Sequence, residues 1–210
     1  MTAALRKLML TTHITFSVGW FGAVAVFLVL SVTGFTSQNP QIVRAMYIAM
    51  GSSTWFVILP ACLGALLSGL IQSLVTPWGL FKHYWIVVKL LLTILSTLLL
   101  LMHMQPISYL ADVASATFIS DTDLRDLRIQ LIGDAAAALF VLLIIITISV
   151  YKPWGKIQYG LKEKESQDEI TIDKKSVKRK PFGLYILLGI IFLMLLVGLL
   201  HLFGIGIGGH

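Results

Sequence analysis

The stretch LIGDAAAALFVLLIIITISV, residues 131–150, decides the fold of this chain. Its twenty positions contain a single charged residue, Asp134. A run of about 20 apolar residues is long enough to cross a bilayer as a helix. Four further apolar runs of sufficient length occupy residues 8–34, 54–75, 84–102 and 182–202. Because backbone polar groups in lipid must bond within their own segment, all five runs are expected to be helices.

The overall composition agrees with this interpretation. Apolar residues make up 57% of the chain and charged residues 12%, about half the charged fraction of a soluble domain. We therefore expect an all-α, polytopic transmembrane helical bundle. Residues 1–150 would form a four-helix core, residues 151–181 a basic loop, and residues 182–210 a fifth helix with a glycine-rich tail.

The distribution of positive charge predicts the orientation. With a cytoplasmic N-terminus, thirteen of the 16 lysines and arginines fall on the cytoplasmic side or close to it, which is the side that favours them. The C-terminus then lies outside. The basic loop at 151–181 is expected to contact anionic lipid headgroups. Nucleic-acid binding is not expected, because no aromatic residues alternate with the lysines of residues 174–180.

Local signals shape the second span. Asn39 followed by Pro40 is typical of a helix start. We expect a short amphipathic helix over residues 40–50, lying along the outer surface and ended by Gly51. Pro60 is expected to kink the helix that follows, because proline cannot donate the backbone hydrogen bond of a helix interior.

Small residues recur on the second span with the period of a helix face. Ala61, Ala65 and Gly69 follow one another every four positions, as do Gly64 and Ser68. Such faces let two helices approach closely. The sequence leaves two partners open for this face: another helix of the same bundle, or a second copy of the chain in a homodimer.

Ionisable groups within membrane spans are costly and mark functional candidates. One group lies toward the cytoplasmic side. His13 and Trp20 share a face of the first helix, and His83 begins the third helix with Lys89 deeper in it. Two histidines from neighbouring helices can ligate a haem b iron. The alternative is that both histidines bond water or backbone, while Lys89 extends toward the surface.

A second group lies toward the outer side. Met102, His103 and Met104 end the third span, His201 lies near the end of the fifth, and Asp134 lies in the fourth. Thioether and imidazole ligands suit Cu(I). The alternative is that the methionines pack against neighbouring helices and His103 faces lipid headgroups.

Asp134 is the only carboxylate within an apolar span. We expect it to point into the bundle, because an exposed charge in lipid is costly. Its expected partner is His103, His201 or an arginine such as Arg128. The pair could be a structural ion pair or part of a proton or metal relay.

The two groups together suggest a dihaem arrangement, with His13 and His83 inside and His103 and His201 outside. The two histidines of the third helix are 20 residues apart, which is about 30 Å along a helix. At about 100° per residue they project roughly 200° apart. One four-helix core that holds both haems would favour histidines on the same face.

Four segments resemble a family of bacterial predicted integral membrane proteins of unknown function. They are HITFSVGWFG at residues 13–22, TPWGLFKHYWIVVKLLLT at 76–93, MHMQP at 102–106 and HLFGIGIGGH at 201–210. That family is similar in layout to copper resistance protein D and to small membrane cytochromes b. The resemblance implies a bacterial cytoplasmic membrane and a bundle of four helices with a fifth added.

No nucleotide-binding loop, nucleophile elbow or zinc-protease motif occurs in the chain, so an enzyme is not expected. The sequence favours a membrane protein that binds haem b or a metal through its histidines, for electron transfer or metal handling. Copper binding or transport at the outer face is one alternative. A non-catalytic scaffold or partner subunit with structural histidines is another.

Overall fold

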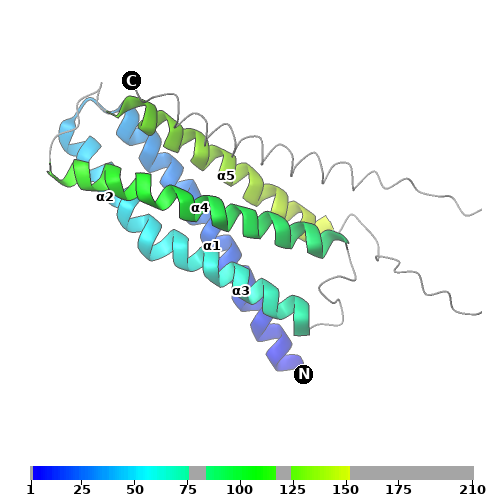
Figure 1. Cartoon of the computed structure of the whole chain (residues 1–210). Helices are drawn as coiled ribbons and strands as arrows, with labels where there is room; N and C mark the ends of the chain where they lie inside the picture. Colours follow the sequence, from blue (N-terminus) through cyan, green and yellow to red (C-terminus); the bar gives the residue numbers. More distant parts are fainter. Residues whose placement is uncertain (1, 76–83, 117–123, 152–210) are drawn as a thin grey trace, which may run out of the picture.

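The computed structural model describes residues 2–75, 84–116 and 124–151 of the chain. These residues form a bundle in which α1 (Ala3–Thr36), α2 (Pro40–Ser53), the π-helical turn η1 (Thr54–Ile58), α3 (Leu59–Val75), α4 (Tyr84–Ala116) and α5 (Arg125–Tyr151) follow in order. Because α2, η1 and α3 join end to end, the helices make four long passes that lie alongside one another (Figure 1).

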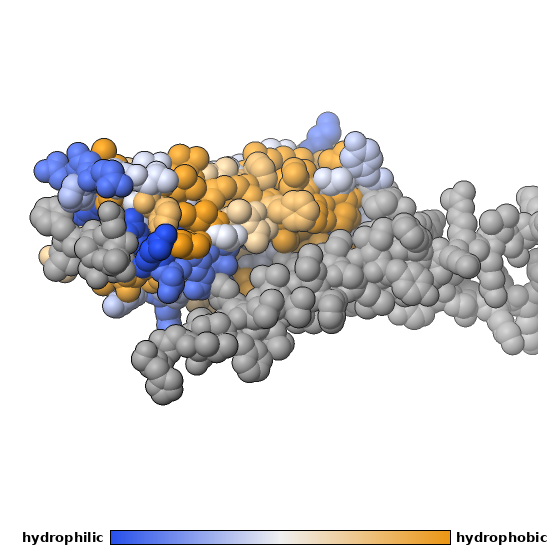
Figure 2. Space-filling model, turned by 90° about the horizontal axis from the view of Figure 1, so that it is seen from above, coloured by the Kyte–Doolittle hydropathy of each residue, from blue (hydrophilic) through white to orange (hydrophobic). Residues whose placement is uncertain are grey.

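All four passes are long and apolar enough to cross a membrane, and no more than 28% of the most apolar window of any pass is buried. Most of each window therefore faces outward, as in a protein surrounded by lipid. Figure 2 shows apolar residues across the middle of one face and hydrophilic residues gathered toward the end that carries the α1–α2 connection. The predicted all-α bundle is thus confirmed, with four helices in the described residues that are long and apolar enough to cross a membrane.

The remaining predictions of the layout lie outside the described residues. They are the fifth span at 182–202, the basic loop at 151–181 with its lipid headgroups, and the glycine-rich tail. The cytoplasmic N-terminus, the external C-terminus and the bacterial cytoplasmic membrane stay predictions. The two ends of the bundle are accordingly named by the chain, as the N-terminal end and the α1–α2 end.

The prediction that Gly51 ends a separate surface helix is wrong. Asn39 does cap the start of α2, where its side-chain oxygen accepts from the backbone N–H of Gln41 at 2.9 Å. The helix then continues through Gly51 into η1 and α3. A Cβ on Gly51 would lie 2.7 Å from the Cβ of Ala111, so this glycine allows α2 and α4 to pack closely.

The π-helical turn directly precedes Pro60. Within it the backbone N–H of Leu59 bonds the carbonyl of Thr54, five residues earlier. Pro60 has no N–H to offer the preceding turn. A local π turn widens the helix at such a position and keeps the chain helical. The expected perturbation at Pro60 therefore takes the form of a π turn inside a continuous pass.

Helix α4 runs to Ala116, well beyond the predicted end at Met102, and contains Pro106. Its 33 residues span about 50 Å, more than the roughly 30 Å of a hydrocarbon core. Packing explains the extension, because Ile107, Leu110 and Ala114 are all buried. Contacts with α2 thus maintain the helix where its own sequence becomes less apolar.

Candidate functional site

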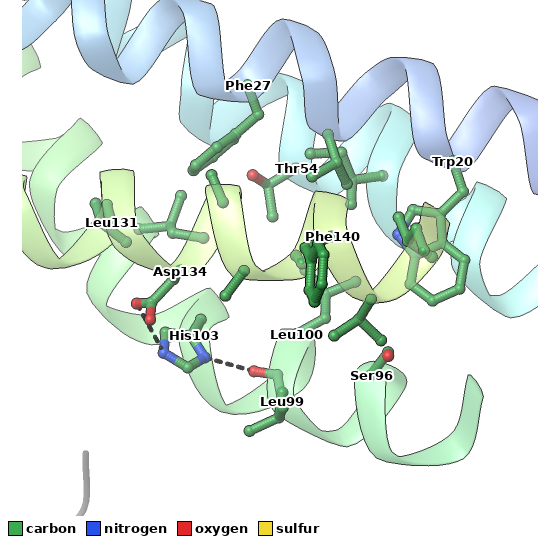
Figure 3. Close-up of a pocket in the computed structure, with 18 residues that line it drawn as sticks. Trp20, Phe27, Thr54, Ser96, Leu99, Leu100, His103, Leu131, Asp134 and Phe140 are labelled. Atoms are coloured by element: carbon green, nitrogen blue, oxygen red, sulfur yellow. Dashed lines mark hydrogen bonds and ion pairs between the residues drawn. The ribbon is translucent and has the colours of Figure 1, made fainter. Parts of the chain in front are cut away.

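A cavity of about 220 Å³ lies inside the bundle, between α1, η1, α4 and α5. Figure 3 shows Trp20 and Phe27 of α1, Thr54 of η1, and Phe140 of α5 around it. Aliphatic side chains complete most of the wall. Such a concave, largely apolar space with a few polar groups is the usual form of a small-molecule site.

The sequence of α5 explains why this space is not filled. Ala135, Ala137 and Ala138 all line the cavity, and a methyl side chain cannot span the gap between helices. From α1, Trp20, Val24 and Phe27 form a buried stripe with the spacing of one helix face. Large residues of α1 thus face small residues of α5 across the cavity.

One polar pair lies in the cavity wall, formed by His103 of α4 and Asp134 of α5. The imidazole Nε2 is 3.1 Å from Oδ2 of the carboxyl group, and Nδ1 is 2.6 Å from the backbone oxygen of Leu99 (Figure 3). Of the three partners predicted for Asp134, His103 lies beside it, while His201 lies outside the described residues. The two side chains are 16% and 27% exposed, so the pair is only partly desolvated.

The tautomer of His103 follows from its contact with the backbone. A carbonyl oxygen only accepts, so Nδ1 of His103 carries a proton that it donates to Leu99. Its Nε2 faces Oδ2 of Asp134 at 3.1 Å, so the two side chains form a polar contact between α4 and α5.

The cavity opens between α4 and α5. Its floor consists of buried residues of α1, η1 and α5. Its rim includes the half-buried Ser96 and Leu100 of α4 together with the exposed Phe140 of α5, whose side chain is 62% exposed. These rim residues lie on the sides of two helices that are long and apolar enough to cross a membrane.

A second polar cluster joins four helices nearer the N-terminal end. His13 of α1 is buried; its Nδ1 lies 3.0 Å from the hydroxyl of Ser68 of α3 and its Nε2 lies 3.0 Å from Nζ of Lys89 of α4. Lys89 also donates to Ser149 of α5 at 3.2 Å. Lys89 thus points into the bundle and does not extend to the surface as expected from the sequence.

Donors and acceptors in this cluster can be assigned. The hydroxyl of Ser68 donates to the carbonyl of Gly64, so it accepts from Nδ1 of His13. The Nε2 lone pair of His13 then accepts from Lys89. Both ring nitrogens are therefore engaged, and haem ligation through His13 would require Lys89 to move away.

The residues predicted to ligate haem or copper lie together only in part. His83 and His201 lie outside the described residues, so neither haem pair is tested. Met102 is exposed, Met104 is buried, and His103 turns toward Asp134, so these three neighbours on α4 face different directions. Among the described residues, no three histidine, cysteine, aspartate or glutamate side chains are grouped as a metal site would need.

The small-residue face of α3 packs within the bundle. A Cβ on Gly64 would lie 2.5 Å from the ring of Phe16, and one on Gly69 would lie 2.9 Å from Cε1 of His13. Both neighbours belong to α1, and Ala61 and Ala65 are buried. This favours internal packing for the face, while a homodimer stays an untested prediction.

A third polar cluster, which the sequence did not reveal, lies at the α1–α2 end. Arg128 of α5 is only 2% exposed. Its Nε donates to the hydroxyl of Tyr47 at 2.7 Å, and its Nη2 donates to the carbonyl of Gly34 at 2.9 Å. The guanidinium also lies 5.4 Å from the ring centroids of Phe35 and Tyr47. Arg128 therefore joins α1, α2 and α5, and it is not the partner of Asp134.

Comparison of the chain with protein-family models, curated proteins and solved structures found no match. The resemblance to bacterial membrane proteins thus stays a prediction.

Proposed function

We propose that this chain binds a small, largely apolar molecule that enters its bundle from the lipid bilayer. The observation that carries the proposal is the cavity of about 220 Å³ with the His103–Asp134 pair in its wall. Apolar walls supply most of the binding free energy of such a ligand, and one or two polar groups set its orientation.

The size of the cavity limits the ligand. An apolar protein cavity of about 150 Å³ takes up benzene, so a space of about 220 Å³ accommodates one ring with short substituents. A longer apolar tail could leave through the opening between α4 and α5. The cavity size and the opening therefore support a lipid-soluble ligand with a compact head rather than a water-soluble molecule.

Tryptophan fluorescence offers a direct test, because Trp20 lines the cavity and is only 5% exposed. Bromobenzene quenches tryptophan emission on contact and is small and apolar. The Trp20 component is the difference in emission between the wild type and Trp20→Phe. We expect bromobenzene to quench this component with saturation. No saturable quenching of this component would contradict the proposal.

Two substitutions on α5 provide a matched pair. Ala138→Phe would fill the cavity and should abolish the saturable quenching, because Ala138 lines it. Ala136→Phe adds the same ring at an exposed position two residues away and should leave the quenching unchanged. Equal effects of the two substitutions would place the bound bromobenzene outside the cavity.

Haem b ligation, the function favoured by the sequence, is retained as a second proposal. The buried position of His13 supports it, while the bond from Lys89 to Nε2 opposes it. An absorption spectrum of the pure protein tests this directly, since bound haem b gives a strong Soret band. Its loss in His13→Ala or His83→Ala would locate the ligands, and a colourless protein would exclude the proposal.

A further inference from the structure

The polar cluster of His13, Ser68, Lys89 and Ser149 is separate from the cavity, since none of these residues lines it. The Nζ of Lys89 lies 3.0 Å from Nε2 of His13 and 3.2 Å from the hydroxyl of Ser149. Both partners accept these bonds as neutral groups. The cluster therefore places a cationic side chain among neutral ones, inside a bundle whose helices are long and apolar enough to cross a membrane.

The part of the chain that the structure describes supplies no anion near Lys89. Its carboxylates are those of Asp112, Asp126 and Asp134. Along α4, Asp112 is 23 residues from Lys89, which is about 35 Å. Along α5, Asp134 is 15 residues from Ser149, which is about 22 Å, and Asp126 is farther away. An ammonium group among apolar helices is costly unless an opposite charge lies close to it, so the cluster favours an anionic partner supplied by a ligand.

Two hydrogen-bond donors in the cluster indicate the kind of anion. An ammonium group has three N–H donors, and the bonds to His13 and Ser149 use two of them. The hydroxyl of Ser149 accepts from Lys89, and its own proton has no acceptor among the described residues. Both Lys89 and Ser149 are half-buried, so an entering group could reach them. An oxyanion can accept from adjacent N–H and O–H donors at the same time.

Helix α3 holds the cluster in place from the opposite side. Ser68 contacts Nδ1 of His13 at 3.0 Å, and a Cβ on Gly69 would lie 2.9 Å from Cε1 of His13. Glycine at position 69 thus makes room for the imidazole ring, whose Nε2 faces Lys89. Because Lys89 is already ordered by these contacts, it loses little side-chain freedom when it binds an anion.

Apolar surface next to the pair suits an alkyl chain on the ligand. Val150 directly follows Ser149 on α5 and is 69% exposed, and Leu91 of α4 is 44% exposed. Burial of apolar area by an alkyl chain adds binding free energy in proportion to that area. We propose that Lys89 and Ser149 bind an oxyanion, the carboxylate or phosphate head of an amphiphile, between α4 and α5.

Four probes separate the contributions of the oxyanion and of the alkyl chain. They are decyl phosphate, decanoate, the uncharged 1-decanol, and inorganic phosphate. Binding to the full chain in micelles of a neutral detergent would be measured by titration calorimetry, after subtraction of the partition of each probe into protein-free micelles. We expect decyl phosphate and decanoate to bind about 10- to 100-fold more tightly than 1-decanol, which is the range expected for hydrogen bonds to charged groups.

Substitutions then locate the effect. Lys89→Met should reduce the preference for the two oxyanions over 1-decanol to about twofold or less, while Lys89→Arg should retain most of it, because the charge and N–H donors remain. Ser149→Ala should weaken oxyanion binding by about three- to tenfold, since it removes one donor. Circular dichroism of each variant reports whether the helices are intact. If Lys89→Met loses its helical signal, Lys89→Gln replaces it, because glutamine keeps N–H donors without the charge.

Two exposed residues provide matched controls. Lys7→Met removes the same charge from the exposed surface of α1, and Thr147→Ala removes an exposed hydroxyl two residues before Ser149 on α5. Both should leave the preference unchanged. A preference that falls as much in Lys7→Met as in Lys89→Met would arise from the overall positive charge of the chain, and it would overturn the proposal.

The remaining outcomes are equally direct. Equal affinity of the wild type for decyl phosphate, decanoate and 1-decanol overturns the oxyanion site, as does a preference that survives in Lys89→Met. Inorganic phosphate that binds as tightly as decyl phosphate would show that the alkyl chain contributes nothing, and it would overturn the assignment to an amphiphile. These results are independent of the cavity, whose probe, bromobenzene, carries no charge.

Discussion

Substitution of Arg128 by methionine should destabilise the bundle strongly. The change removes a donor to Tyr47 at 2.7 Å and a donor to Gly34 at 2.9 Å, and it leaves the tyrosine hydroxyl and the glycine carbonyl without this partner. Hydrogen bonds to charged groups contribute about 1.5–3 kcal/mol each. Methionine recovers part of this loss, because its thioether costs less to bury than a guanidinium. We expect a net loss of about 3 kcal/mol in the free energy of unfolding.

The assay is reversible unfolding of the purified chain in mixed micelles with increasing denaturing detergent, followed by circular dichroism. Tyr47→Phe removes only one of the two bonds of Arg128 and should cost about 1.5 kcal/mol. Arg125→Met is the matched control, since Arg125 is exposed one turn earlier on α5, and it should change stability by less than about 0.5 kcal/mol. The reasoning is refuted if Arg128→Met and Arg125→Met unfold at the same detergent fraction.

Two further stability predictions use the same assay. A double-mutant cycle of His103→Ala and Asp134→Ala should give a coupling energy of about 1–3 kcal/mol, as expected for groups in direct contact; additive losses would show that the 3.1 Å pair does not stabilise the fold. Gly51→Ala should cost about 1–3 kcal/mol, because its Cβ would lie 2.7 Å from that of Ala111. A Cβ on Gly133 would meet nothing within 4 Å, so Gly133→Ala should instead raise the free energy of unfolding by about 0.5–1 kcal/mol. If Gly133→Ala destabilised the protein more than Gly51→Ala, the packing described for α2 and α4 would be contradicted.

The helical character of the described residues could be predicted because it depends on local composition. A run such as 131–150 is long and apolar enough to cross a bilayer whatever its neighbours are. In lipid its backbone N–H and C=O groups must bond within the segment, which a helix allows. Helix lengths could not be predicted in the same way. Helix α4 continues past Met102 because Ile107, Leu110 and Ala114 pack against other helices, and that contact depends on the tertiary arrangement.

The candidate site was predictable to a similar degree. Asp134 is a lone carboxylate in an apolar run, which indicated an inward-facing group with His103 among its possible partners. The cavity itself gave no signal, since the DAAAA run at 134–138 reads equally well as close helix packing. Lys89 was expected at the surface, because sequence position does not show whether a long cationic side chain extends outward or turns into the bundle. Arg128 was a possible partner of Asp134, but it bonds Tyr47 and Gly34.

A crystal structure of the chain with bromobenzene would test the central claim most directly, because anomalous scattering locates bromine without ambiguity. We predict a bromine peak inside the bundle, between Trp20, Phe140 and the His103–Asp134 pair, and its disappearance in Ala138→Phe. Bromine found only on the lipid-facing surface, with the wild-type cavity closed by its own side chains, would contradict the account.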